Sequence, residues 1–245
     1  MELNQENYYS DDANREFFSV SQYKSFMSCE ARAMAEISGE YVRPVTRALL
    51  VGSFVDRYFE GTLEDFMKEN PAIFTRKKEL RAEFKRANKI IETVKTDPKF
   101  MDAMSGEKQR IFTFELFGVK WKAKLDSYNA GKAITDLKVV AKMYQLPQWR
   151  YDLQGAVYQK GVEICTGEKL PFYLAVVTKE MVMDRDIWQI PQSTLDMALR
   201  QVEENIGRYA DVKAGYIEPH FCGKCDYCKS IKKATVRNYN ELLMD

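Results

Sequence analysis

The chain has 245 residues, of which 45% are apolar and 30% are charged, a balance typical of globular proteins and not of disordered ones. Lys and Arg number 37 and Asp and Glu 36, so the net charge of +1 excludes a generally basic nucleic-acid coat. The longest apolar runs are much shorter than a membrane span, and the acidic, polar first residues carry no secretory signal. We therefore expect a cytoplasmic protein with no membrane partner.

Helical spacing of apolar residues dominates the first hundred residues. We expect residues 1–18 to form a flexible acidic lead-in to this helical part. Three helices are predicted after it: one that begins at Ser19 or Ser21, one that begins at Pro44 and stops near Gly61, and one from Lys77 to Thr96.

Strand patterns replace the helical spacing after Gly106. Three strands are predicted as an antiparallel meander, Arg110–Leu116, Val119–Tyr128 and Ala133–Val140. The elements expected beyond them are a helix over 148–165, strands over 172–178 and 186–190, and a helix over 193–214. This order predicts an α/β (α+β) fold in which helices flank a mixed central sheet that includes the meander.

No internal repeat or Gly/Ser-rich linker divides the chain, so we expect a single domain over residues 19–240. Its expected parts are a helical N-terminal part over 19–105, a core over 106–190, and a C-terminal helix with a cysteine cluster over 191–240. Chemistry-bearing residues are concentrated in the core and in the cysteine cluster.

Two carboxylates and a lysine are predicted to meet in the meander. Asp126 ends the second predicted strand, and a short hairpin brings it alongside Asp136 in the third. Asp136 and Lys138 share one face of that strand, while Leu137 points to the core. Such a group suits an oxygen-liganded divalent ion such as Mg²⁺. The plainer alternative for a D-x-K pair alone is a surface ion pair on an edge strand.

Two other groups strengthen the first interpretation. Gln154 and Tyr158 are four residues apart on the next predicted helix and therefore share a face. Asp56 follows Gly52 on the second predicted helix. Taken alone, the first pair is a polar and an aromatic residue packing on a helix, and the second is a packed glycine followed by a solvated aspartate.

In this order, these motifs resemble the PD-(D/E)XK nuclease superfamily, and among its branches the RecB/RecE-type exonucleases of phage and bacterial recombination. That branch has a G-x-x-x-H helix, a metal-binding Asp, a (D/E)-x-K strand and a Q-x-x-x-Y helix. The resemblance covers roughly residues 19–230, and the combination is more specific than any one motif. It implies a restriction-endonuclease-like core.

The resemblance also implies roles for the singled-out residues. Asp56 stands where the branch usually has His, and a carboxylate is a competent ligand for Mg²⁺ or Mn²⁺; Glu60, one helical turn on, is a rival ligand. The implied roles are metal ligation by Asp126, Asp136 and the Leu137 carbonyl, orientation or deprotonation of the attacking water by Lys138, and positioning of DNA by Gln154 and Tyr158.

Cys222, Cys225 and Cys228 form two consecutive C-x₂-C steps, which is the spacing of metal ligands. A metal is favoured over disulfides in a reducing cytoplasm, and three unpaired thiols are the alternative. The fourth ligand is either His220, which gives a zinc Cys₃His site, or Cys29 on the first predicted helix.

Some nucleases of the same superfamily have one cysteine before the core and three after it, and these hold a four-iron–four-sulfur (4Fe–4S) cluster. The CRISPR-adaptation nucleases and the helicase–nuclease subunits of double-strand-break repair are of this kind. The resemblance favours an iron–sulfur cluster held by Cys29 and the three clustered cysteines over Zn²⁺.

Two basic clusters are candidate DNA contacts. Arg81 and Lys85 belong to a mostly basic face of the third predicted helix, and a second patch around the cysteines includes Lys224, Lys229 and Arg237. Such patches bind the phosphate backbone without sequence preference and in a salt-sensitive way. A solvated helix face is the alternative for the first cluster.

The resemblance implies an Mg²⁺-dependent DNA exonuclease, encoded by a phage or prophage and acting in a bacterial host cell. It would resect linear double-stranded DNA, 5′ to 3′, for a recombination protein that anneals single strands, and relatives of this kind often form homo-oligomeric rings. Two alternatives stay open: a CRISPR-adaptation-type iron–sulfur nuclease that trims single-stranded DNA ends, and a non-catalytic, cluster-bearing DNA-binding module.

Overall fold

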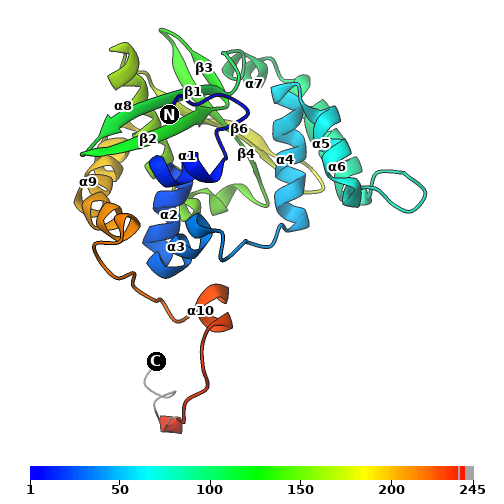
Figure 1. Ribbon diagram of the computed structural model, residues 1–245. Helices are drawn as coiled ribbons and strands as arrows, with labels where there is room; N and C mark the ends of the chain where they lie inside the picture. The colour runs from blue at the N-terminus through cyan, green and yellow to red at the C-terminus, as the bar shows by residue number, and fades with distance from the viewer. Residues whose placement is uncertain (237, 241–245) are drawn as a thin grey trace.

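A mixed four-stranded sheet forms the centre of the computed structural model, which describes residues 1–236 and 238–240 (Figure 1). Its order is β3 (Ser127–Asn129), β4 (Ala133–Val140), β5 (Phe172–Thr178) and β6 (Arg185–Gln189). Strands β4 and β5 run parallel, and the other neighbours are antiparallel. The predicted α/β class with a mixed sheet is confirmed.

The first strands of the predicted meander form a sheet of their own. Strands β1 (Arg110–Leu116) and β2 (Val119–Leu125) pair as a hairpin through Phe117 and Gly118, whose positive φ angles of 55° and 75° suit a two-residue turn. The structure thus divides the meander at Asp126, between β2 and β3. A side-chain oxygen of Asp126 accepts the N–H of Leu137 on β4. Asp126 is therefore hydrogen-bonded to the central sheet through its side chain.

Helices cover both faces of the central sheet and close two apolar cores (Figure 1). Alternate residues of β5 enter the two cores, because successive side chains on a strand point to opposite faces: Leu174 and Val176 enter one, Ala175 and Val177 the other. The first core is closed by α2 (Val20–Ser28), α8 (Tyr151–Thr166) and α9 (Gln192–Ala214). The second is closed by α4 (Arg47–Glu60), α5 (Leu63–Glu69), α6 (Ala82–Lys95) and α7 (Pro98–Ala103).

The first predicted helix is two helices. The Ser19 hydroxyl caps α2 by accepting the N–H of Gln22 (3.2 Å). The chain then breaks at Cys29, whose backbone is extended, and α3 (Glu30–Ser38) follows. The break has a tertiary cause, because the N–H of Ala31 donates to the carbonyl of His220 (3.1 Å) near the other end of the chain.

Three other predicted helix starts lie too early in the chain. Helix α4 begins after its Thr46 cap instead of at Pro44, and it ends at Gly61 as predicted. Helix α6 begins only after Arg81, because Lys78 takes a left-handed backbone (φ 60°) in a turn that closes before the helix. Helix α8 begins at 151, and the 3₁₀ helix η2 (Met143–Trp149) precedes it. Elements outside the predictions also include α1 (Asp11–Glu16), η1 (Pro71–Ile73), α5, α7 and the short helix α10 (Asp226–Ser230).

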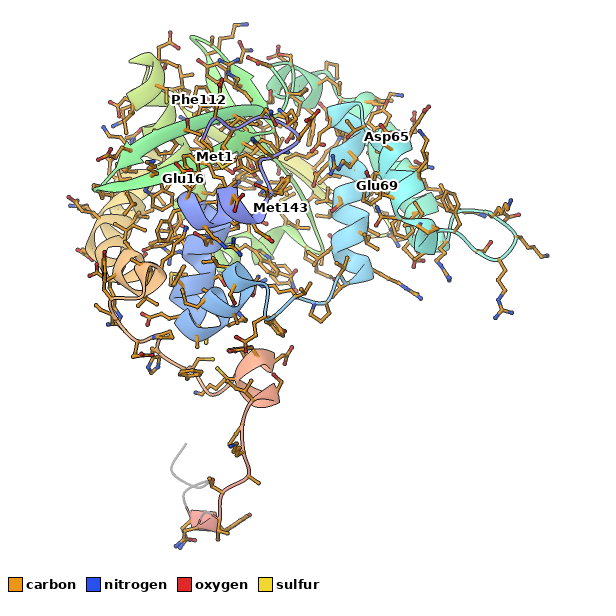
Figure 2. All side chains as sticks on the ribbon, viewed as in Figure 1. Met1, Glu16, Asp65, Glu69, Phe112 and Met143 are labelled. Atoms are coloured by element: carbon orange, nitrogen blue, oxygen red, sulfur yellow. The ribbon has the colours of Figure 1, made fainter. Side chains whose placement is uncertain are left out.

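Residues 1–18 are packed, so the prediction of a flexible lead-in is wrong. Tyr8, Phe17 and Phe18 are each at most 5% exposed. The terminal ammonium of Met1 pairs with Glu16 (3.0 Å), and Figure 2 shows the two residues together by the β1–β2 hairpin. Acidic surface residues dominate the composition of this segment and suggested a flexible chain. The few buried aromatic residues are what pack it against the rest of the protein.

The C-terminal segment leaves α9 and returns to the N-terminal helices. Helix α10 (Asp226–Ser230) lies below α3 in Figure 1, away from the sheet. Tyr227 and Cys228 pack there with Cys29 and Ala31 in a small third core. Arg237 of the second basic patch lies outside the described residues. None of the described helices combines the length and the apolar character needed to cross a bilayer.

Candidate functional site

Strand pairing places Asp126 next to Asp136. Ser127 on β3 faces Thr135 on β4, so the residue before Ser127 stands across from the residue after Thr135. One carboxylate oxygen of Asp126 accepts the N–H of Leu137 (2.9 Å), and the other accepts the side-chain amide of Gln109 (3.2 Å). The pairing register of β3 and β4 therefore places the two carboxylates side by side, and the hydrogen bond from Leu137 holds the side chain of Asp126 against β4.

Asp136 connects β4 to α8. Its side chain is almost fully buried, and its Oδ1 accepts the side-chain amide of Gln154 (2.7 Å). Its Oδ2 forms an ion pair with the Lys138 ammonium, which also lies 5.0 Å from the centre of the Tyr151 ring. Leu137 between them is buried in the second core, as the alternation of the strand predicts.

The charge states of this pair follow from burial and proximity. Burial raises the pKa of Asp136 to about 7, although the neighbouring Lys138 ammonium lowers it. Burial alone would lower the pKa of Lys138, but the carboxylates of Asp136 and Asp126 outweigh it, so the pKa of Lys138 is raised. In this geometry Lys138 keeps its proton at neutral pH and is a fixed positive charge.

A small cavity of about 10 Å³ lies between α4 and the Asp126 edge of the sheet, close to what a single water needs. Asp56, Glu60, Asp126 and Leu137 line it together with Phe59, Met104 and Gln109. Burial, and after it the negative charge of Asp126, raise the pKa of Asp56 well above its usual value. A divalent cation would relieve this repulsion, and an oxygen-only donor set suits Mg²⁺ or Mn²⁺. The residues present therefore fit such an ion.

The approach of α8 to the sheet depends on Gly155. A Cβ atom at this position would lie 2.6 Å from Phe172 and 2.9 Å from Leu195, so any larger residue pushes the helix away. This close approach brings Gln154 within hydrogen-bond distance of Asp136. Tyr158, one turn on, lies with Gln154 along a second cavity instead of contacting the carboxylates.

Lysines that no prediction covered lie along this second cavity. Lys24 on α2 and Lys122 and Lys124 on β2 line it beside Gln154, and its volume is about 230 Å³. The sequence did carry a signal, because the lysines of β2 alternate with Trp121 and Ala123 in the two-residue period of a strand. These lysines share a cavity only because α2 and residues 1–18 pack beside β2. Sequence patterns do not reveal the positions of those two segments.

Four cysteines converge at the other end of the molecule. The sulfurs of Cys29, Cys222, Cys225 and Cys228 all lie within 4.8 Å of one another. Cys228 Sγ is 3.6 Å from Cys29 Sγ and 3.9 Å from Cys222 Sγ. His220 is not part of this group; its backbone is used instead, because its N–H donates to Glu30 (2.8 Å) and its carbonyl accepts Ala31. Of the two proposed fourth ligands, the fold brings in Cys29.

The C-x₂-C steps arrange backbone donors around the sulfurs. Cys222 Sγ accepts the N–H groups of Lys224 (3.4 Å) and Cys225 (3.3 Å), and Cys225 Sγ accepts that of Cys228 (3.5 Å). The two N–H donors lower the pKa of Cys222 to about 6, whereas burial raises the pKa of Cys228 to about 12. Cys165 is exposed on α8 and stands apart from the group.

The four predicted DNA-contact residues lie outside both cavities described above. Arg81 precedes α6 and donates to the carbonyl of Ala72 (2.9 Å), and Lys85 pairs with Glu79 (3.2 Å). Lys224 and Lys229 flank the cysteine group. Their contact with DNA stays a prediction.

Comparisons with known proteins show which families and structures this chain resembles. Residues 19–231 match the family described as "PDDEXK-like domain of unknown function (DUF3799)". The crystal structure of a "putative exonuclease" from Eubacterium rectale is similar over 99% of this chain and 98% of that one, with 45% identity and a TM-score of 0.96. The crystal structure of SSO0001 aligns with 85% of this chain and 96% of that one at 14% identity, with a TM-score of 0.35, which is too low to indicate a shared fold. No curated protein matches the chain significantly.

Proposed function

The chain belongs to the PDDEXK-like domain family, and on that premise we propose that it is a divalent-metal-dependent exonuclease acting on linear double-stranded DNA. The family and the relative from Eubacterium rectale support a nuclease with a restriction-endonuclease-like core. The name of that relative supports cleavage from ends. The observation that carries the proposal is the convergence of Asp126, Asp136 and Lys138 at one hairpin.

Asp126, Asp136 and the carbonyl of Leu137 would hold Mg²⁺ or Mn²⁺. Asp126 and Leu137 line the small cavity, and Asp56 faces it from α4. When bound, the ion would supply positive charge for the phosphate undergoing cleavage and would acidify a water nucleophile. Asp56 and Glu60 face this cavity from α4, so either carboxylate is placed to complete the ligand set.

The remaining residues prepare the site. Lys138 holds its proton, so its proposed role is to orient the attacking water and to stabilise negative charge on the phosphate. Gln154 occupies one oxygen of Asp136 and thereby fixes the orientation of that carboxylate. Tyr151 packs against the lysine, and Tyr158 lies with Gln154 along the cavity where we propose that DNA passes.

Direction and biological role belong to the same proposal. The likeness to RecB/RecE-type exonucleases supports 5′ to 3′ resection that leaves a single strand for a strand-annealing recombination protein. A homo-oligomeric ring around DNA in a bacterial host infected by a phage, or carrying a prophage, fits this role.

The test is digestion of a linear duplex labelled separately at each 5′ and 3′ end, with Mg²⁺ or with EDTA. We expect metal-dependent release of the 5′ label as mononucleotides by the wild type and none by Lys138→Ala. Lys142→Ala is the control, because Lys142 follows the same strand but pairs with Glu180 outside the site. Absence of cleavage by protein with its cysteine site occupied would instead support a DNA-binding module.

For the cysteine group we propose a single tetrahedral Zn²⁺ ion. A Zn–S bond of about 2.3 Å places four thiolates about 3.8 Å apart at the corners of a tetrahedron. The separations of 3.6 and 3.9 Å around Cys228 agree with that spacing. In a 4Fe–4S cluster each thiolate binds a different iron, which holds the sulfurs farther apart. The sulfur spacing therefore supports zinc over the iron–sulfur cluster that the resemblance favours.

A further inference from the structure

The lysine-lined cavity beside Gln154 has no part in the proposed metal site. Four segments form its walls: residues 1–18, the start of α2, strand β2 and helix α8. Its volume of about 230 Å³ is below the roughly 300 Å³ at which small-molecule pockets usually begin. It is therefore suited to a compact group and not to a whole cofactor.

Positive charge dominates the lining of this cavity. Three ammonium groups line it, those of Lys24, Lys122 and Lys124, and no carboxylate does so among the described residues. Lys122, which is 2% exposed, donates to the carbonyl of Tyr8 (2.6 Å) and to Asn14 Oδ1 (2.8 Å). Lys24 donates to the carbonyl of Trp149 (2.8 Å). All these partners are neutral.

Lys124 has the fewest partners of the three. Its ammonium lies 4.6 Å from the centre of the Tyr9 ring and 5.3 Å from that of Tyr8, and within the described part of the chain it makes no hydrogen bond or ion pair. Burial lowers the pKa of both Lys24 and Lys122 to about 8; for Lys24 the Lys138 ammonium adds to this shift, and the carboxylates of Asp136 and Asp152 oppose it without offsetting it. An anion in the cavity would remove this destabilisation.

Hydroxyl groups complete the lining. The side chains of Ser19 and Ser21 lie 2.9 Å apart at the start of α2 and face the cavity with the positive end of that helix. Ammonium groups, hydroxyls and a helix N-terminus together are a donor set that matches the oxygens of a phosphate.

Gln154 joins this cavity to the proposed active site. Its side-chain amide donates to Asp136, while its side chain also lines the cavity. We propose that the cavity binds a phosphate group of the DNA substrate adjacent to the one that is cleaved, and that residues 1–18 close over it. The location relative to the cleaved bond rests on the proposed function; the phosphate site itself rests on the three lysines.

The N-terminal segment, residues 1–18, covers this cavity. Tyr8, Tyr9 and Asn14 contribute to the lining, and the family match begins only at residue 19. Tyr9 is 66% exposed, so its ring faces the Lys124 ammonium without being held in the core. These residues therefore add a substrate contact outside the matched domain.

The test measures DNA binding in EDTA, where no cleavage occurs, by fluorescence anisotropy of a labelled duplex. Lys124→Met removes the charge and keeps the side-chain stem against the tyrosines. We expect its Kd to rise about fivefold at low salt and the slope of log Kd against log salt to fall by about 0.9, the loss of one phosphate contact. Lys120→Met is the matched control, because Lys120 lies on the same strand but pairs with Glu16 outside the cavity.

Duplexes with phosphate or hydroxyl at each end distinguish the source of the phosphate. A Lys124→Met effect confined to phosphorylated ends identifies a terminal monoester, and an equal effect on all ends identifies a backbone diester. An unchanged Kd and salt slope in Lys124→Met would overturn the proposal. Because binding is measured without metal, this result is independent of whether the protein cleaves DNA.

A second measurement compares salts. At constant ionic strength, replacing chloride by inorganic phosphate should raise the Tm of the wild type more than that of Lys124→Met, because the general stabilising effect of phosphate is common to both proteins and only the intact cavity adds specific binding. An equal rise in both proteins would also count against the phosphate site.

Discussion

The two proposed metal sites are assembled in different ways. Asp126 and Asp136 come from one hairpin of the central sheet, and the pairing of two short strands brings them together. Cys29 and Cys228 are separated by 199 positions in the chain and meet only because the C-terminal segment returns to the break between α2 and α3. Local register therefore determines the first site, and the path of the whole chain determines the second.

Their electrostatics differ as well. The carboxylate site contains buried like charges, and burial, followed by the negative charge of Asp126, raises the pKa of Asp56. The cysteine group lies in a small apolar core, where backbone N–H groups donate to the sulfur of Cys222. We infer that the carboxylates were placed for chemistry at some expense of stability, whereas the cysteines hold the two ends of the chain together.

Asp136→Asn should have the largest effect and should separate chemistry from stability. The amide keeps the shape and the contact with Gln154 but removes the charge that a cation needs, so we expect cleavage to fall on the order of a thousandfold. Burial disfavours the charged carboxylate, whereas its loss leaves the Lys138 ammonium without its ion-pair partner, so the two effects oppose each other and the Tm of the metal-free protein should change little. Cleavage rates and thermal melts measure both effects.

Asp186→Asn is the control for this substitution, since Asp186 is exposed on β6. A large fall in Tm for Asp136→Asn would contradict the division of roles, because it would make the carboxylate a stabilising residue. Near-normal cleavage by this variant would remove Asp136 from the proposed site.

The sequence predicted the parts of the carboxylate site that follow from local periodicity. The two-residue period of a strand puts Asp136 and Lys138 on one face, and the helical period puts Gln154 near Tyr158. The division of the meander at Asp126 escaped prediction, because the residue there bonds to β4 through its side chain and not through its backbone.

Long-range features were beyond the sequence patterns. The choice of Cys29 over His220 depends on where the C-terminal segment meets α3, and the choice of metal depends on distances between sulfurs. The lysine cavity depends on the packing of residues 1–18, whose composition alone indicates a flexible segment. Pattern and propensity do not contain such tertiary contacts.

Cys228→Ser should have the second largest effect, and on stability instead of chemistry. Loss of one thiolate would open the proposed tetrahedral site, so we expect less bound metal and a free energy of unfolding lower by at least about 2 kcal/mol. Elemental analysis should find one zinc per wild-type chain and less in the variant, and denaturant unfolding measures the stability.

Cys165→Ser is the matched control, because Cys165 is exposed and stands apart from the group. It should keep both the zinc and the stability of the wild type. Iron with acid-labile sulfide and visible absorbance in the purified wild type would overturn the zinc proposal in favour of the cluster.

The smallest expected effect concerns the N-terminal segment, which belongs to neither metal site. The Lys213 ammonium on α9 donates to the carbonyl of Phe17 and to Gln22 Oε1, both at 2.8 Å. Burial lowers the pKa of Lys213 to about 7, and the nearby positive charge of Lys122 contributes to this shift. In the unfolded chain the lysine titrates near its usual value of 10.5.

Between pH 7 and pH 10, therefore, the unfolded chain binds more protons at this position than the folded chain, and the stability contributed by Lys213 rises with pH. Lys213→Met removes the titrating group, so its Tm should rise less than that of the wild type between pH 7 and pH 9. Lys160→Met, on the surface beside Glu163, should follow the wild type. Parallel Tm curves for Lys213→Met and the wild type would mean that the ammonium is solvated in the folded state, and that residues 1–18 lie less tightly on α9 than the contacts of Phe17 indicate.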